Sequence, residues 1–416
     1  MAALTNTSAD AILKVLYPGG LNDVTIKDYP SLAILKKKTF RSAGGSKMHI
    51  PVRYGYGSGA SATFTNALGN TSADSFAGFD VTLARMFGVK QIDGLTLASM
   101  ANDKQAFVTG LRTIGDSAFK ICNDQLASAI FRTGYGNIGV VSSGYNSTVI
   151  TLTDAKDAIH FEVGMEIKSA ASASGALRTG SATVTAVDRD AGTITTDSNW
   201  NSQITSFANS DYLFVEGNGY NNTAYYMLRG FAGWLPESAP TSGDSWFGQD
   251  RSYDPQRLAG QRLDGSSYGS MEEALIDAVS IASERGASPD LAIMHPKQYR
   301  QLLKDLGSKV QYTMVPAQSL KGPVAGVSFK AVEVHGDRGP VAVVSDPWCQ
   351  SDDCWILQSD SVFLASAGEC PHILADDGNK YLRVYNADTY EVRVGAYAQL
   401  AFEAPGANLH LYDLPF

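Results

Sequence analysis

The chain has 416 residues, more than the roughly 100–200 of one domain, and we therefore expect two or three structural units. Charged residues make up only 18% of it, below the roughly 25% usual for soluble domains, and 44% of it is hydrophobic. This composition excludes a disordered chain and favours a surface covered by partners. The net charge of −9 excludes a nucleic-acid binder that depends on an overall basic surface.

The charge is unevenly distributed. Residues 1–50 hold seven basic and three acidic side chains, a net charge of +4, which predicts a basic arm before an acidic body. No basic segment followed by an apolar stretch begins the chain, and no run of about 18 apolar residues occurs in it. We therefore expect neither export by a signal peptide nor a membrane span, and we interpret the four cysteines as reduced thiols.

Two segments near the N-terminus alternate in the manner of strands, residues 48–54 and 78–87. Between them, Gly55 to Ala77 consists mostly of small residues. An isolated two-stranded hairpin is marginally stable in water. We therefore expect this long hairpin to lie on another subunit.

A helical period follows from Thr96 to Arg132, closed by Gly134, and predicts a helix about 50 Å long at 1.5 Å per residue. Residues 139–220 return to β alternation with an acidic balance, which predicts a small β domain inserted after the helix.

The second half begins with a clear helix start. Ser270 and Glu273 form a capping box for a helix that ends at Gly286. A buried strand at 289–294 and a helix at 296–306 follow, and further strands are expected at 331–334, 341–344 and 355–357. The tail from Ser361 to Tyr412 is nearly all alternating strand.

Motifs that suggest catalysis are weak. Ser267 lies in a Gly-x-Ser-x-Gly match, but residues 258–264 do not resemble the hydrophobic strand that a nucleophile elbow needs, so we expect a loop that leads into the helix cap. The six histidines are scattered, the pairs Asp352/Asp353 and Asp376/Asp377 are typical of turns, and Cys349 and Cys354 have a poor zinc spacing. We therefore predict no enzyme, no metal site and no cofactor.

Several motifs in the second half resemble the major capsid proteins of tailed bacteriophages. The resemblance is good over about 231–412 and general over the insertion, and its motifs are Gly230-Phe-Ala-Gly-Trp-Leu235, Phe247-Gly-Gln-Asp-Arg-Ser252, Arg257-Leu-Ala-Gly260, Pro289 to Pro296, Tyr299 with Leu302, Val310-Gln-Tyr312, Asp377-Gly378, Tyr390-Glu391 and Pro405-Gly406. It implies an α+β chain with the Hong Kong phage capsid fold. The implied parts are an N-terminal arm at 1–40, an extended loop at 41–93, a peripheral domain at 94–138, 221–264 and 358–416, an inserted β domain at 139–220 and an axial domain at 265–357.

The resemblance also implies a function. The chain would be the structural subunit of an icosahedral virion capsid, made in the host bacterial cytoplasm and assembled from pentamers and hexamers around double-stranded DNA that it contacts non-specifically. Its partners would be copies of itself, a portal, a separate scaffolding protein and possible decoration proteins, without a membrane. We expect inter-subunit contacts at these residues: Lys36, Lys37, Lys38, Arg41, Tyr54, Tyr56, Phe64, Phe76, Phe79, Arg85, Trp234 and Arg251.

Two departures and three alternatives bear on this hypothesis. Some relatives crosslink through a lysine of the extended loop, but Gly55 to Gly78 contains none, so we expect no covalent crosslink. About forty residues precede the first hairpin strand, too few for a built-in scaffold, which favours a separate scaffolding protein if the chain is the full gene product. A nanocompartment shell of the same fold, a β-rich tail or adhesin protein, and a hydrolase built on Ser267 remain open.

Overall fold

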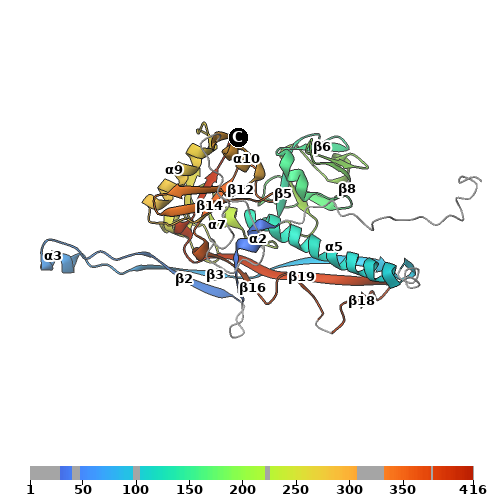
Figure 1. Cartoon of the computed structure of the whole chain (residues 1–416), viewed down its shortest axis with the longest axis horizontal. Coiled ribbons are helices and arrows are strands. Elements are labelled where there is room, and N and C mark those ends of the chain that lie inside the picture. Colours follow the sequence, from blue (N-terminus) through green and yellow to red (C-terminus); the bar gives the residue numbers. More distant parts are fainter. Residues whose placement is uncertain are drawn as a thin grey trace, which may run out of the picture.

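The structure is a computed structural model that describes residues 29–39, 47–96, 104–220, 225–306, 332–375 and 378–415. Figure 1 shows a body of two sheets and a long helix, from which a barrel and a two-stranded hairpin project. The α+β class is as predicted. Most of the predicted arm, including Arg41, lies outside the described residues, as do residues 97–103 of the predicted helix.

The long helix is α5, Lys104–Phe131. Its 28 residues span about 42 Å at 1.5 Å per residue, and its backbone confirms the prediction over this range. Ala118, Cys122 and Leu126 recur every fourth residue and are buried, because α5 lies along one face of a sheet (Figure 1). The approach is close: a Cβ at Gly88 in that sheet would come within 2.4 Å of the Ala118 carbonyl oxygen.

That first sheet is centred on a 14-residue strand, β19. It has the order β1-β16-β19-β17, and β18 and β4 also pair with β19. Its strands are β1 (Lys36–Thr39), β4 (Ala84–Asp93), β16 (Val362–Ser366), β17 (His372–Ile373), β18 (Leu382–Arg383) and β19 (Thr389–Phe402). The predicted strand at 78–87 is therefore divided, because only β4 joins this sheet.

The inserted domain is a closed barrel with the strand order β10-β5-β6-β9-β8-β7. Its strands are β5 (Asn137–Ser143), β6 (Val149–Leu152), β7 (Glu166–Ala170), β8 (Ala182–Asp188), β9 (Thr193–Thr196) and β10 (Tyr212–Val215). Alternate residues such as Ile150 and Ile194 point inward and are fully buried with Phe161, in a core that also contains Trp200 of the short helix α6 (Trp200–Gln203). The alternation predicted β6, β8 and β9 but not the other three strands.

The second sheet has the order β11-β20-β15-β12-β14-β13. Its strands are β11 (Gln261–Asp264), β12 (Leu291–Met294), β13 (Val332–Gly336), β14 (Gly339–Ser345), β15 (Cys354–Leu357) and β20 (Leu409–Tyr412). Helices α9 (Met271–Glu284) and α10 (Pro296–Leu306) follow the predicted boundaries closely. The predicted cap is present, because the Ser270 hydroxyl accepts a hydrogen bond from the Glu273 amide at 3.2 Å.

One prediction about this sheet is wrong. Residues 261–264 form a strand before Ser267, although we expected none, because β11 pairs in parallel with β20. The same pairing places β11 and β20 in the sheet of the predicted axial domain, whereas the predicted peripheral domain included 221–264 and 358–416. Strands β11 and β20 pair at one edge of this sheet. Alternation of apolar and polar residues predicts a strand, but it does not indicate which sheet the strand joins.

Both faces of the second sheet are buried. Leu291 and Ile293 of β12 belong to the core that also contains the buried residues of α5 and β19. Ala292 and Met294 belong to the core beneath α9 and α10. Trp355 and Ile356 of β15 divide in the same way. Strands buried on both faces read as continuous apolar runs, as this segment does. The sheet therefore joins the two halves of the body into one packed unit.

Candidate assembly surfaces

The hairpin is formed by β2 (Met48–Gly55) and β3 (Ser75–Val81), which pair antiparallel from Met48 opposite Val81 to Gly55 opposite Ser75. A short helix that the sequence analysis did not anticipate, α3 (Phe64–Gly69), lies at its tip. Figure 1 shows the hairpin extending well beyond the body. The prediction of a long hairpin is confirmed.

The inner end of the hairpin is anchored in the body. The Asp80 amide donates to the Phe247 carbonyl at 2.9 Å, and the Arg257 guanidinium donates to the Tyr54 carbonyl. Phe79 is fully buried, with its ring centroid 5.1 Å from that of Trp234 in an edge-to-face arrangement. The base of the hairpin is thus fixed in direction by the core.

The outer end has no such support. The side chains of Tyr56, Phe64, Leu68 and Phe76 are 79%, 84%, 63% and 67% exposed. Residues 54–73 contain no charged side chain. Exposed apolar side chains grouped on one projecting element are typical of an interaction surface, because a free surface of this kind is costly in water. We call residues 56–76 the hairpin tip.

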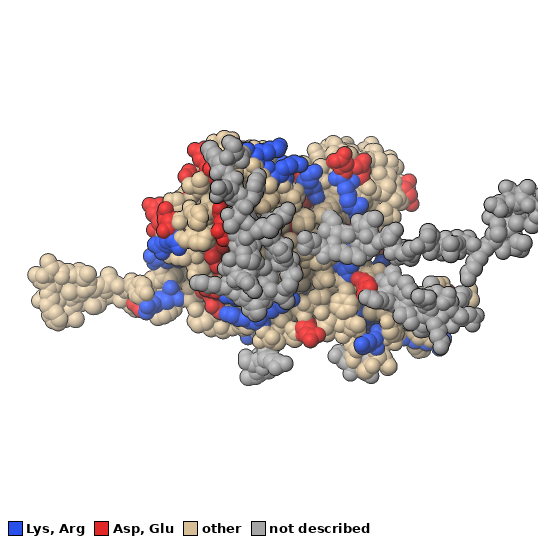
Figure 2. Space-filling view, in the orientation of Figure 1, with Lys and Arg blue, Asp and Glu red and all other residues tan. Residues whose placement is uncertain are grey.

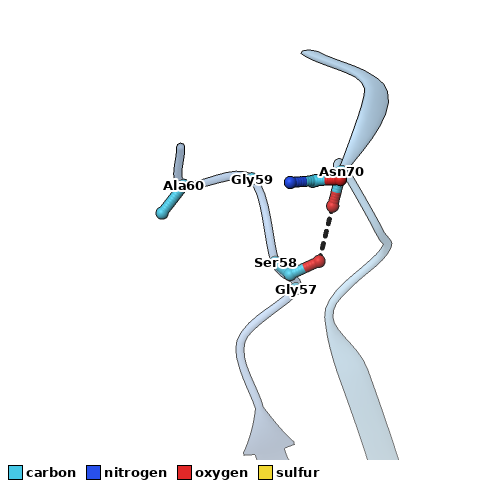
Figure 3. Close-up of a pocket in the computed structure, with 5 residues that line it drawn as sticks. All are labelled: Gly57, Ser58, Gly59, Ala60 and Asn70. Carbon is cyan, nitrogen blue, oxygen red and sulfur yellow. Dashed lines mark hydrogen bonds between the residues drawn. The ribbon is translucent and has the colours of Figure 1, made fainter. Parts of the chain in front are cut away.

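The tip is held in shape by its own hydrogen bonds. Figure 3 shows a shallow hollow lined by Gly57, Ser58, Gly59, Ala60 and Asn70, where the Ser58 hydroxyl donates to the Asn70 carbonyl. The Gly57 amide donates to Asp74 at 2.9 Å. A Cβ at Gly57 would lie 1.8 Å from the Ser72 carbonyl oxygen, so this crossing requires glycine.

The predicted basic contacts are largely used within the chain. Lys36 forms an ion pair with Asp360, and Lys38 pairs with Glu403 while lying 4.1 Å over the Phe363 ring. Lys37 and Arg85 are exposed, on β1 and β4. Tyr54 is half-buried against the main core.

Three of the residues predicted to contact other subunits are buried in the core of this chain. Phe79 and Trp234 are fully buried, and the Trp234 indole donates to the Leu400 carbonyl at 3.0 Å. Arg251 is 4% exposed and pairs with Asp244 at 2.7 Å while donating to the carbonyls of Gly233 and Trp234. The apolar residues on both sides of Trp234 in the sequence indicate that this side chain is buried.

Ser267 is exposed in the turn after β11, and within the described ranges no histidine or carboxylate is hydrogen-bonded to its hydroxyl. The described residues also contain no group of three or more histidine, cysteine or acidic side chains that could hold a metal ion. Cys349 and Cys354 are buried, and burial raises the pKa of both thiols, which keeps them protonated. No helix in the described ranges is long and apolar enough to cross a membrane.

No protein-family model matches the sequence, and no curated protein matches it significantly. Solved structures do match. A chain of the capsid asymmetric unit of cyanophage A-1(L) aligns with a TM-score of 0.56 at 12% identity, over 99% of this chain and 100% of that one. The chain has the phage major capsid fold. A capsid chain of a native GTA particle aligns at 0.48 with 9% identity, over 99% of both chains, and the SrpI encapsulin of Synechococcus elongatus PCC 7942 at 0.45 with 7% identity, over 100% of this chain and 98% of that one.

The observed elements can be set beside the parts that the resemblance implied. The hairpin lies within the residues predicted for the extended loop, and α5 lies within those predicted for the spine helix. The second sheet lies largely within the residues predicted for the axial domain, and we call it the axial sheet. The barrel is the predicted insertion, and in Figure 1 it stands beside the axial domain on the same side of the spine.

Proposed function

We propose that this protein is the major structural subunit of an icosahedral phage capsid, which assembles from pentamers and hexamers around double-stranded DNA. One observation carries the proposal: on a chain with the capsid fold, the hairpin tip, which has no charged side chain at residues 56–73, projects from the body with Phe64 and Leu68 exposed (Figure 1 and Figure 2). Each tip lies over the body of a neighbouring copy. Axial domains meet in the rings, and the hairpins join each ring subunit to the next.

The energetics favour many weak contacts over a few strong ones. Burial of apolar surface contributes roughly 25 cal/mol per Å², and a stable interface buries on the order of 1,000 Å² or more. The tip side chains are more than half exposed, so they can supply such surface without breaking contacts inside the subunit. In a closed shell each copy both gives and receives a tip, so a modest contact is repeated around the particle.

The N-terminal arm is the second assembly element. Residues 29–39 pack into the body: the Tyr29 hydroxyl donates to Asp124, Ser31 donates to the buried Asp346, and β1 pairs with β16. Deletion of residues 1–28 therefore tests the arm without removing a strand, and we expect soluble capsomers or monomers in place of shells. Normal shells from this variant would remove the arm from the mechanism. Because Lys36 and Lys38 already form ion pairs with acidic side chains, we expect other basic side chains to contact the packaged DNA.

The decisive experiment compares the wild type with the double variant Phe64→Ser, Leu68→Ser by negative-stain electron microscopy and sedimentation, with and without a co-expressed scaffolding protein. We expect shells or regular rings from the wild type and a folded monomer with an unchanged unfolding midpoint from the variant. The matched control, Tyr145→Ser with Val163→Ser, removes two exposed apolar side chains from the barrel and should assemble normally.

Two results would contradict the proposal. A tip variant that assembles as the wild type does would exclude the hairpin tip as the contact, and a wild type that stays monomeric under every condition would exclude a shell protein. Particles from producing cells, treated with nuclease, should protect double-stranded DNA. Particles that hold only protein cargo would instead identify a nanocompartment shell.

A further inference from the structure

A cage of aromatic rings surrounds one arginine where the barrel joins the body. The Arg229 guanidinium lies 3.9 Å from the ring centroid of Tyr225, 4.4 Å from that of Phe247 and 5.2 Å from that of Trp246. Tyr135, just before β5, stacks on Tyr225 at 5.3 Å. The cage thus contains residues of the body and of the connection to the barrel.

The connection itself is a tight neck. The chain leads into the barrel past Tyr135 and returns past Tyr220, whose amide donates to the Tyr135 carbonyl at 2.9 Å. The rings of Tyr135 and Tyr220 meet edge to face at 5.3 Å. Gly134, at a φ of 94°, passes so close to Arg229 that a Cβ there would lie 2.8 Å from the arginine Cγ. The arginine stem is therefore held in place.

Among the described residues, Arg229 has a charge but no acceptor for its hydrogen bonds. In the part of the chain that the structure describes, no carboxylate lies within 4.0 Å of its guanidinium and no oxygen accepts a hydrogen bond from it. The nearby Arg251 differs, because Asp244 neutralises it. Burial lowers the pKa of Arg229, whereas the neighbouring Tyr225, Tyr135 and Tyr220 raise it. Guanidinium N–H donors that are partly removed from water cost free energy unless oxygens accept hydrogen bonds from them.

The geometry of the cage indicates which kind of chemical group could bind Arg229. Rings that cover the faces of a guanidinium leave its edge free, and the edge is the part that binds a planar pair of oxygens bidentately. Arg229 is intermediate in exposure, so part of its side chain is open to solvent. We propose that the edge of the Arg229 guanidinium binds an oxyanion, a carboxylate or phosphate group, at the neck of the barrel. The oxyanion comes either from a carboxylate side chain of a second copy or from free phosphate.

The test is a titration of the full-length, unassembled chain with inorganic phosphate and, separately, with acetate at constant ionic strength, followed by thermal unfolding. We expect a saturable rise in the unfolding midpoint for the wild type and for Arg383→Gln, which removes an exposed arginine elsewhere. Arg229→Gln should lose the saturable rise. Arg229→Lys keeps the charge but not the bidentate fork, and should need at least a fivefold higher concentration. Phosphate also stabilises proteins non-specifically, so only the difference between variants counts.

The two sources of the oxyanion are separated by assembly. If a second copy supplies a carboxylate, Arg229→Gln impairs assembly, and assembled particles no longer bind phosphate. If free phosphate is the ligand, Arg229→Gln assembles normally and assembled particles still bind phosphate. Equal titrations for the wild type and Arg229→Gln, together with unchanged assembly, would overturn the proposal. The titration does not need assembly, so it remains decisive even if the proposed capsid function fails.

Discussion

At the residue scale, the core is organised around Trp234. Its ring packs against Phe79 of the hairpin, Phe247 and Phe402, and its indole nitrogen reaches the Leu400 carbonyl at 3.0 Å. Trp234 therefore joins the hairpin base and β19 to the segment that follows the barrel, residues 225–264, which we call the return segment. Arg251, which we expected at an interface, donates to the Trp234 carbonyl and closes this cluster.

Replacement of Trp234 by alanine should be strongly destabilising. Truncation of a buried aromatic side chain costs about 3–5 kcal/mol, since it removes apolar burial and leaves a cavity. We expect a large fall in the denaturant midpoint of Trp234→Ala, measured by circular dichroism. The control Phe76→Ala, at a side chain that is 67% exposed, should change the midpoint little. A small effect of Trp234→Ala would contradict this account of the core.

A second residue, His295, makes stability depend on pH. Burial lowers its pKa to about 4, and its Nδ1 accepts a hydrogen bond from the Lys297 amide at 3.1 Å, which requires an unprotonated nitrogen. Asp154 and Lys156 of the barrel face it, and so do Lys297 and Arg300 of α10. The folded chain holds His295 neutral in this setting.

The sign of the effect follows from linkage. Because the folded pKa lies below the ordinary value of about 6.5, stability from His295 is complete above that pH and is lost as the pH falls towards 4. Between pH 7 and pH 5 the loss is on the order of 2 kcal/mol. His295→Asn retains a cap acceptor without titrating, so its unfolding midpoint should fall less over this range. His335→Asn, at an exposed histidine, should follow the wild type.

At the element scale, the barrel is a self-contained unit. Its sheet is closed, so it has no free edge, and its core includes Phe161, Trp200 and Leu213, all fully buried. The two ends of the insertion meet at the neck, where Tyr220 pairs with Tyr135. The barrel also contacts the body through the buried ion pair of Arg132 with Asp157, at 2.6 Å.

We predict that residues 135–220 fold when expressed alone. A closed sheet with its own core and adjacent ends meets the requirements of an independent domain. The fragment should give a β-type circular dichroism spectrum and a cooperative thermal transition. Trp200→Ala in the fragment should abolish that transition, whereas Val163→Ser at an exposed position should not. A fragment without a cooperative transition would show that the barrel depends on the body.

At the scale of the whole molecule, the axial sheet and the spine share one core. Leu291 and Trp355 of the axial sheet belong to the same cluster as Leu126 of α5 and Phe402 of β19. Phe231 stacks on Trp355 at 5.5 Å, which ties the return segment to the axial sheet. The parts named as peripheral and axial domains are thus two regions of one packed body, and the barrel is the separate unit.

Calorimetry should show this division. We expect two unfolding transitions for the unassembled chain, one for the barrel and one for the peripheral and axial regions together, because only contiguous cores unfold cooperatively. Replacement of residues 136–219 by a short Gly-Ser linker should remove one transition and leave the other. Separate transitions for the axial and peripheral regions would contradict a shared core.

Local periodicity in the sequence was sufficient for several elements. The four-residue spacing of α5, the Ser270 cap of α9 and the apolar strand β12 are encoded by neighbouring residues, and each lies near its predicted position. The small residues between β2 and β3 indicated a long hairpin without a core. These features depend on interactions within a few residues, which a sequence shows directly.

Only the tertiary structure decided which residues stay exposed. Phe64 and Phe79 lie in the same hairpin, yet the first is 84% exposed and the second fully buried, because Trp234 covers only the base. The membership of β11 and β20 in the axial sheet, and the aromatic cage around Arg229, likewise join segments that are far apart in the chain. Contacts of this kind depend on packing in three dimensions, and no period or motif in the sequence encodes them.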